Sequence, residues 1–275
     1  MKNYEVMLKK ILSIAIAMFL VFLFASCQKE VFDPALTQQE FAIQATANGA
    51  TYNIKVGLPA DYNPATKKYA TMYVLDGEEN FDFVSNKCKE ISDKLGVTNV
   101  VVIGIGYGRD RSIDYTPAKT SSGTIGSIEF LNFIETQLIP KMQETYRVDT
   151  ARSSRVILGH SFGGLFVANV YSINNKLFGN YIILSPSLWF DNLVSLQFEK
   201  ENQSKNKDRA QLVFMGLGGA ENLGRMQAPF EAFYQMLRGN YTSIKLAKNI
   251  EKDLDHRGSE HPNIVKGLNY YFENR

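Results

Sequence analysis

Arg155-Val156-Ile157-Leu158-Gly159-His160-Ser161-Phe162-Gly163-Gly164 is the stretch that decides the fold of this chain. A short apolar run leads without a linker into Gly-x-Ser-x-Gly, and the residues that follow, 165–171, have a helix-like composition. Between a strand and a helix, this motif is typical of a serine nucleophile. The sequence therefore predicts that Ser161 is catalytic.

The glycine spacing in this motif has a steric reason. A serine on so tight a turn adopts strained backbone angles, and side chains two residues away on either side would collide with the strand or the helix. Gly159 and Gly163 occupy those positions, and Gly164 allows the helix to pack closely. The turn also leaves the N–H of Phe162 free at a helix N-terminus, where it can donate to a developing oxyanion.

Strand-like and helix-like segments alternate around this turn. Residues 41–46 and 52–58 alternate like an antiparallel hairpin around Asn48-Gly49. Further strands are expected at 68–75, 97–104, 181–184, 211–215 and 241–247, helices at 81–95, 127–146, 188–200, 226–238 and 262–272, and polar segments at 107–126 and 201–209. This order predicts an α/β-hydrolase fold, with a mostly parallel, doubly wound sheet and helices on both faces.

The first 27 residues differ from the rest of the chain. Lysines at 2, 9 and 10 precede an apolar run over 11–25, and small residues stand just before Cys27, as in a bacterial lipobox. We expect a lipoprotein signal peptide over 1–27, a tether over 28–39 and one hydrolase domain over 40–275. The mature protein would be exported and anchored by lipid on Cys27 to the bacterial cell envelope; an uncleaved N-terminal anchor is the alternative.

Charge and cysteine content restrict the partners. The formal net charge of +2 gives no reason to expect nucleic acid as a partner. With Cys27 lipidated, Cys88 has no disulfide partner and is expected to be a buried small hydrophobe. Because no Cys/His cluster with ligand spacing accompanies the histidines, we expect neither a metal nor another cofactor.

Three histidines restrict the search for the base. His160 lies inside the turn with its ring directed away from the hydroxyl of Ser161, and is interpreted as a structural or substrate-pocket residue. His256 and His261 both lie between the last strand and the last helix, where this fold places its base. We favour His256, because His261 directly precedes Pro262 and is directed towards the start of the helix.

The acid is expected after the strand over 211–215. That strand runs into a glycine-rich segment that ends in a single carboxylate, Glu221, which we take as the acid. Asp253 and Asp255 are alternatives, although neighbours of His256 on one loop seldom face its ring.

A second oxyanion donor is expected from the loop that follows the strand over 68–75. Gly77 would let the backbone approach the substrate carbonyl, so that a main-chain N–H of Gly77 or Glu78 could donate to the oxyanion. The same loop could serve only to cap the next helix through Asp76 or Asn80.

Four motifs in this order carry a family resemblance: Val74-Leu75-Asp76-Gly77, Arg111-x-x-Asp114-Tyr115-Thr116-Pro117, Gly159-His160-Ser161-Phe162-Gly163-Gly164-Leu165-Phe166 and Ser185-Pro186-Ser187-Leu188-Trp189-Phe190. Together they resemble the putative esterase (esterase D-like) family of α/β-hydrolases. Within that family they are similar to the branch of siderophore trilactone esterases that act on enterobactin-type compounds. The resemblance covers nearly the whole mature chain.

The resemblance implies metal-free ester hydrolysis through an acyl-enzyme, with Ser161 as nucleophile, His256 as base and Glu221 as acid. It also implies that Arg111 and Trp189 line the substrate pocket. One departure is Arg257, which stands where a smaller residue more often follows the base. Feruloyl and acetyl-xylan esters remain alternative substrates, and a lipid-anchored binding protein with an inactive site is the alternative to an enzyme.

Overall fold

The computed structural model describes residues 31–275 except 122, 207, 208 and 210. The expected signal peptide, its lipidation site Cys27 and the first residues of the expected tether, 28–30, lie outside the described residues. Within the described ranges, no helix has both the length and the hydropathy that a bilayer span requires.

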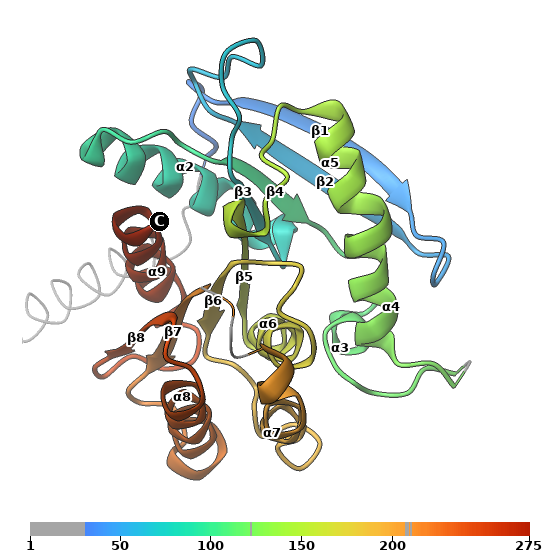
Figure 1. The fold of residues 1–275 in the computed structure, drawn as a ribbon, viewed down its shortest axis with the longest axis vertical. Helices are drawn as coiled ribbons and strands as arrows, with labels where there is room; N and C mark the ends of the chain where they lie inside the picture. Colours follow the sequence, from blue (N-terminus) through green and yellow to red (C-terminus); the bar gives the residue numbers. More distant parts are fainter. Residues whose placement is uncertain (1–30, 122, 207–208, 210) are drawn as a thin grey trace, which may run out of the picture. The chain divides into compact units, whose positions relative to one another are not determined.

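An eight-stranded sheet organises the described chain (Figure 1). Its strands are β1 (Thr37–Gln44), β2 (Thr51–Leu58), β3 (Thr71–Val74), β4 (Val101–Ile105), β5 (Arg155–His160), β6 (Asn180–Leu184), β7 (Gln211–Gly218) and β8 (Ile244–Glu251). Their order is β1-β2-β4-β3-β5-β6-β7-β8. Strand β2 pairs antiparallel with both β1 and β4, and the other pairs are parallel. The predicted entry hairpin and the predicted parallel sheet are both confirmed.

Helices cover both faces of this sheet. They are α2 (Gly77–Leu95), α3 (Arg111–Asp114), α4 (Gly126–Phe133), α5 (Ile139–Thr145), α6 (Phe162–Ile173), α7 (Val194–Asn206), α8 (Ala228–Asn240) and α9 (Glu260–Asn274). Side chains of α2 and α9 pack on one face, and those of α4, α5, α6 and α8 pack on the other. Strand β5 faces both cores, because Leu158 points to the first and Ile157 to the second. Every residue of β5 is buried, as its apolar run predicts.

The amino-terminal boundary of the domain differs from the prediction. Strand β1 begins at Thr37, inside the segment expected to be a tether. Phe32 stacks on Phe81 of α2 with ring centroids 5.5 Å apart. Part of the segment 28–39 therefore belongs to the folded domain.

Two helices contain a π-helical turn just before a proline. The helix expected over 127–146 does not end at Pro140: a π turn, Ile134–Leu138, joins α4 to α5, and Pro140 lies in the first turn of α5. In the same way, the π turn Leu223–Gln227 leads into α8, which has Pro229 in its first turn. In both places the helix continues through the π turn, so the proline lies inside a continuous helical segment, and the extra residue of the π turn stands next to the hydrogen bond that proline cannot make.

Helix α7 lies further along the chain than the sequence pattern suggests. It spans Val194–Asn206 rather than 188–200, and it includes most of the polar segment 201–209. Asn206 is buried, and its side-chain amide donates to the main-chain oxygens of Tyr171 and Ser172. These carbonyls belong to the last turn of α6, where no N–H of the same helix is available to donate to them. The polar segment therefore provides a hydrogen-bond donor for the last carbonyl groups of α6.

Candidate active site

Ser161 occupies a strained turn between β5 and α6. Its backbone angles are φ 60° and ψ −117°, in the left-handed half of the map that non-glycine residues rarely adopt. A Cβ added at Gly159 would lie 2.5 Å from the carbonyl oxygen of Gly163, and one at Gly164 would lie 2.5 Å from that of Leu184. At Gly163 itself the nearest atom would be 3.3 Å away. The predicted collision is therefore confirmed at Gly159 and is much weaker at Gly163, and the predicted close packing is confirmed at Gly164.

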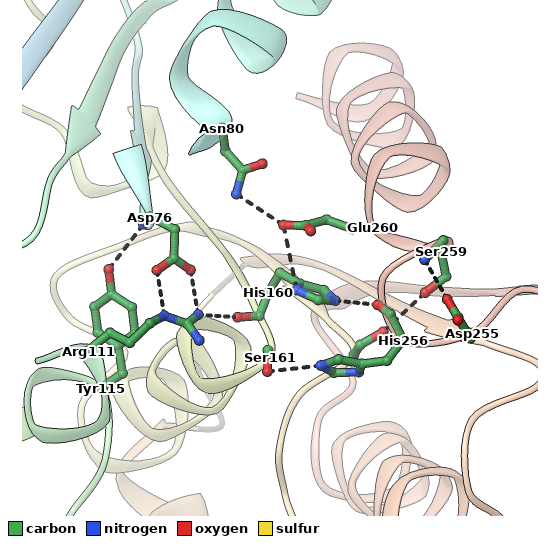
Figure 2. A network of polar contacts seen from close by, with 12 residues as sticks. Asp76, Asn80, Arg111, Tyr115, His160, Ser161, Asp255, His256, Ser259 and Glu260 are labelled. Carbon is green, nitrogen blue, oxygen red and sulfur yellow. Dashed lines mark hydrogen bonds and ion pairs between the residues drawn. The ribbon is translucent and has the colours of Figure 1, made fainter. Parts of the chain in front are cut away.

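His256 connects Ser161 to Glu221. Its Nε2 lies 2.9 Å from Ser161 Oγ and its Nδ1 lies 2.8 Å from Glu221 Oε2. His256 is on the loop between β8 and α9, and Glu221 follows β7, so that the carboxyl ends of three parallel strands, β5, β7 and β8, deliver the three groups. Figure 2 shows the ring of His256 directed at Ser161. The geometry is that of a nucleophile, a base and an acid that orients the base.

Glu221 is held as a carboxylate by three donors. Its side chain is 1% exposed, and Oε1 accepts from Ser185 Oγ at 2.6 Å and from the Gly218 N–H at 2.8 Å. Burial raises the pKa of Glu221, but the hydrogen bonds from His256, Ser185 and Gly218 outweigh it, so that the pKa lies below its ordinary value. An ionised Glu221 accepts a hydrogen bond from Nδ1–H, which leaves Nε2 of His256 free to accept from Ser161.

The alternatives weighed for the base and the acid make other contacts. His261 stacks on Phe83 with ring centroids 3.9 Å apart, on the α2 and α9 side of the sheet. Asp253 is exposed, and the carboxylate of Asp255 accepts from the Gly258 N–H at 2.7 Å. Arg257, the departure from the family motif, is exposed on the same loop.

A cavity of about 410 Å³ opens at Ser161. It is lined by Ser161, Phe162, Ser187, Trp189, Ala220, Glu221, Asn222, Arg225, Met226, Asp255 and His256. A larger cavity of about 670 Å³ is lined by residues at the opposite ends of the strands, such as Asn180 and Gln211. Open α/β sheets bind ligands at the carboxyl ends of their strands, so we take the cavity at Ser161 as the candidate substrate-binding site.

Trp189 lines this cavity, as expected, and is covered by a cation. The guanidinium carbon of Arg225 lies 3.7 Å from the Trp189 ring centroid. Sequence reasoning missed Arg225, because nothing in the segment 223–227 marks it as a pocket residue. Its π-helical backbone brings it there.

Of the expected oxyanion donors, Phe162 lies at the cavity and Gly77 and Glu78 do not. Phe162 is the first residue of α6, so its N–H has no acceptor within the helix. Gly77 and Glu78 line a separate cavity of about 30 Å³. Glycine is required at 77 because an added Cβ would lie 2.7 Å from the backbone of Gly104 in β4. The interpretation of Gly77 as a residue that approaches substrate is therefore corrected.

The loop at Asp76 instead supports the serine turn from behind. Asp76 adopts left-handed backbone angles before α2, and its side chain makes no cap. It pairs with Arg111, with Nε 2.8 Å from Oδ1 and Nη2 2.7 Å from Oδ2, and its N–H donates to Tyr115 Oη (Figure 2). Arg111 Nη2 also lies 3.5 Å from the main-chain oxygen of His160. Arg111 is therefore fixed beside the nucleophile, outside the set of residues that line the cavity.

His160 also lies outside the cavity. It is 6% exposed, and its Nε2 lies 2.9 Å from the main-chain oxygen of His256, while Nδ1 lies 3.5 Å from Glu260 Oε1. Burial and the nearby His256 lower the pKa of His160 to about 4, so the ring is neutral near pH 7. The prediction that His160 contacts substrate is wrong, because both ring nitrogens face protein groups.

Comparisons with known proteins agree with this geometry. A family model described as putative esterase matches residues 45–263. The apo-salmochelin esterase of Escherichia coli O6:H1 is 32% identical over 156 residues, which are 50% of this chain and 47% of that protein. The ferri-bacillibactin esterase BesA of Bacillus subtilis is 30% identical over 186 residues, 57% of this chain and 63% of BesA. The matches thus span about half to two thirds of these relatives. The solved structure of an IroE-like serine hydrolase from Shewanella oneidensis superposes with a TM-score of 0.75 at 26% identity, covering 86% of this chain and 80% of that chain.

Proposed function

Since this chain belongs to the putative esterase family, we propose that it is a serine esterase that hydrolyses the ester bonds of siderophores. The observation that carries the proposal is the position of His256, which lies within hydrogen-bond distance of both Ser161 and Glu221 at the wall of a cavity. Two of its relatives are named as esterases of the siderophores salmochelin and bacillibactin.

The first half of the reaction forms an acyl-enzyme. His256 Nε2 takes the proton of Ser161 Oγ as the oxygen attacks the ester carbonyl, and Glu221 stabilises the imidazolium that results. The N–H of Phe162 donates to the oxyanion. When the tetrahedral intermediate collapses, His256 gives its proton to the leaving alcohol.

The second half repeats these steps with water. His256 takes a proton from the water that attacks the acyl carbonyl, and it returns that proton to Ser161 Oγ as the carboxylic acid leaves. A cyclic trilactone would be opened and then shortened by successive rounds of this chemistry.

The cavity suits an acyl group that is aromatic and anionic. Arg225 and Trp189 form one side of it, with the cation stacked on the ring. A catechol group could stack there and meet positive charge. This pairing favours a catecholate siderophore over a neutral aliphatic ester.

The test compares two classes of substrate. The domain that begins after Cys27 is incubated with a catecholate siderophore trilactone, with and without iron, and with a feruloylated arabinoxylan fragment; Ser161→Ala serves as control. Cleavage of the trilactone that vanishes in the variant is expected. Cleavage of the feruloyl ester alone would make the protein a carbohydrate esterase, and no labelling by a fluorophosphonate would favour an inactive binding protein.

The site of action rests on the lipid anchor, which remains a prediction. We propose that lipidated Cys27 holds the enzyme at the cell envelope, where siderophores arrive. An alkyne fatty acid supplied to the cells should label the wild-type protein and leave Cys27→Ala unlabelled; a wild-type protein that stays in the membrane without label would argue for an uncleaved anchor.

A further inference from the structure

His160 contacts the main chain of the proposed base. Its Nε2 lies 2.9 Å from the carbonyl oxygen of His256, and the two rings lie with centroids 4.6 Å apart (Figure 2). A carbonyl oxygen only accepts hydrogen bonds, so Nε2 must carry the proton. In the neutral ring Nδ1 is then bare.

The other side of the His160 ring faces a half-buried carboxyl group. Glu260 Oε1 lies 3.5 Å from Nδ1 and accepts from Asn80 Nδ2 at 3.0 Å. Burial raises the pKa of the Glu260 carboxyl group, and the hydrogen bond from Asn80 opposes that rise. Residues from the start of α2, from β5 and from α9 thus meet around His160.

The loop that carries His256 is held in part through its backbone, since the carbonyl oxygens of Leu254 and Asp255 accept from the N–H groups of Ala220 and Ser259. The side chain of His256 is 39% exposed, and the neighbouring Asp255 and Arg257 are exposed as well. The orientation of the His256 ring therefore depends on its bond to Glu221 and on where the loop backbone is held. His160 directly precedes Ser161, so a bond from its ring joins the rigid serine turn to the backbone of the base.

We propose that His160 is a positioning residue: by donating from Nε2–H to the main-chain oxygen of His256, it sets the distance between His256 and Ser161. The expected effect of His160 on turnover rests on the proposed esterase function. It needs no contact with substrate, which agrees with the location of His160 outside the cavity. A misplacement of the order of 1 Å can lower a rate by about 10²-fold.

The experiment uses variants that differ in their ability to donate at this place. His160→Gln keeps an amide N–H that can reach the carbonyl, whereas His160→Leu has no donor and His160→Asn is too short. His261→Leu, which removes a histidine stacked on Phe83 at the start of α9, is the control. We expect kcat to fall about 10- to 100-fold in the Leu and Asn variants with KM nearly unchanged, and to stay within about threefold of wild type in His160→Gln and in the control.

A second readout does not depend on turnover. The proton between His256 Nδ1 and Glu221 should give a far-downfield proton NMR resonance, which we expect to weaken or move in the Leu and Asn variants and to return in His160→Gln. If the resonance and kcat are unchanged in folded His160→Leu or His160→Asn, or if His160→Gln is as impaired as they are, the positioning role is refuted. A wild-type protein without esterase activity would refute the proposed function, while the resonance would still test His160.

Discussion

Glu221→Gln tests the proposed triad most sharply, because it removes one charge and almost preserves the volume of a side chain that is 1% exposed. Oε1 of Glu221 accepts from both Ser185 and Gly218, whereas Oε2 accepts from His256 alone. In the variant we expect the amide oxygen to keep the two donors at the Oε1 position. The amide nitrogen then faces Nδ1 of His256.

This orientation has two effects on catalysis. A donor at Nδ1 forces the proton of His256 onto Nε2, where it blocks acceptance from Ser161. The lost charge also removes the stabilisation of the imidazolium. For charge centres about 4 Å apart the Coulomb energy is about 4 kcal/mol at an effective dielectric of about 20, and about 3 kcal/mol is a reasonable value for a base that is partly exposed to solvent. This corresponds to a loss of about 10²-fold in rate, and the wrong tautomer extends the expected loss in kcat to about 10³- to 10⁴-fold.

The assay is kcat for p-nitrophenyl butyrate together with the rate of fluorophosphonate labelling. Asp255→Asn is the matched control, because it removes the same charge from the same cavity while its side-chain oxygen can still accept from Gly258. The control should stay within about threefold of wild type, and thermal unfolding should show that both variants fold. If Glu221→Gln retained more than a tenth of wild-type kcat, the assignment of Glu221 as the acid would be wrong.

The remaining predictions concern the turn, the cavity and the effect of acid. Ser161→Ala should lower kcat by about 10⁴- to 10⁶-fold without a change in the unfolding midpoint; preserved turnover would exclude Ser161 as nucleophile. Gly159→Ala should lower the free energy of unfolding in urea by about 1–3 kcal/mol, and Gly163→Ala by clearly less, because an added Cβ would meet the backbone at 2.5 Å at Gly159, whereas at Gly163 the nearest atom is 3.3 Å away; equal losses would contradict this. Arg225→Gln should raise KM about tenfold for a catecholate ester and leave KM for p-nitrophenyl butyrate unchanged; a parallel rise for both would remove Arg225 from recognition. Burial lowers the pKa of His160 from 6.5 to about 4, so between these pH values the unfolded chain binds one proton that the folded chain does not. The free energy of unfolding should therefore fall by up to about 3 kcal/mol as the pH drops from about 6.5 to about 4. Urea titrations of His160→Gln should show a smaller change of the free energy of unfolding with pH, and an unchanged slope would count against this.

Local signals explain what the sequence could predict. The meaning of the glycines around Ser161 and of the hydrophobic pattern of each strand is set by residues close by in the sequence. The order of elements and the serine turn could therefore be predicted. His256 and Glu221 were found because the fold brings the ends of consecutive strands to one edge. This is a topological rule and needs no side-chain detail.

The errors concern contacts between distant segments. Gly77 is required by the backbone of β4, and only the folded sheet shows that neighbour. His160 was interpreted as a pocket residue because its partners lie about a hundred residues away, on the loop of the base and on α9. The first residues of the domain carry no strong strand pattern, and β1 at Thr37 is identified by its pairing with β2.

The π turn Leu223–Gln227 has an evolutionary consequence. A π turn has the length of an α-helical turn with one residue inserted. Deleting one residue there would restore a regular helix and rotate the residues before it by about 100° relative to α8, while Phe230 and Phe233 kept their places in the core. Arg225 would then leave Trp189. A change of a single codon in length, rather than a substitution, could thus alter which esters the cavity accepts, and homologues that differ in length at this point should differ in substrate.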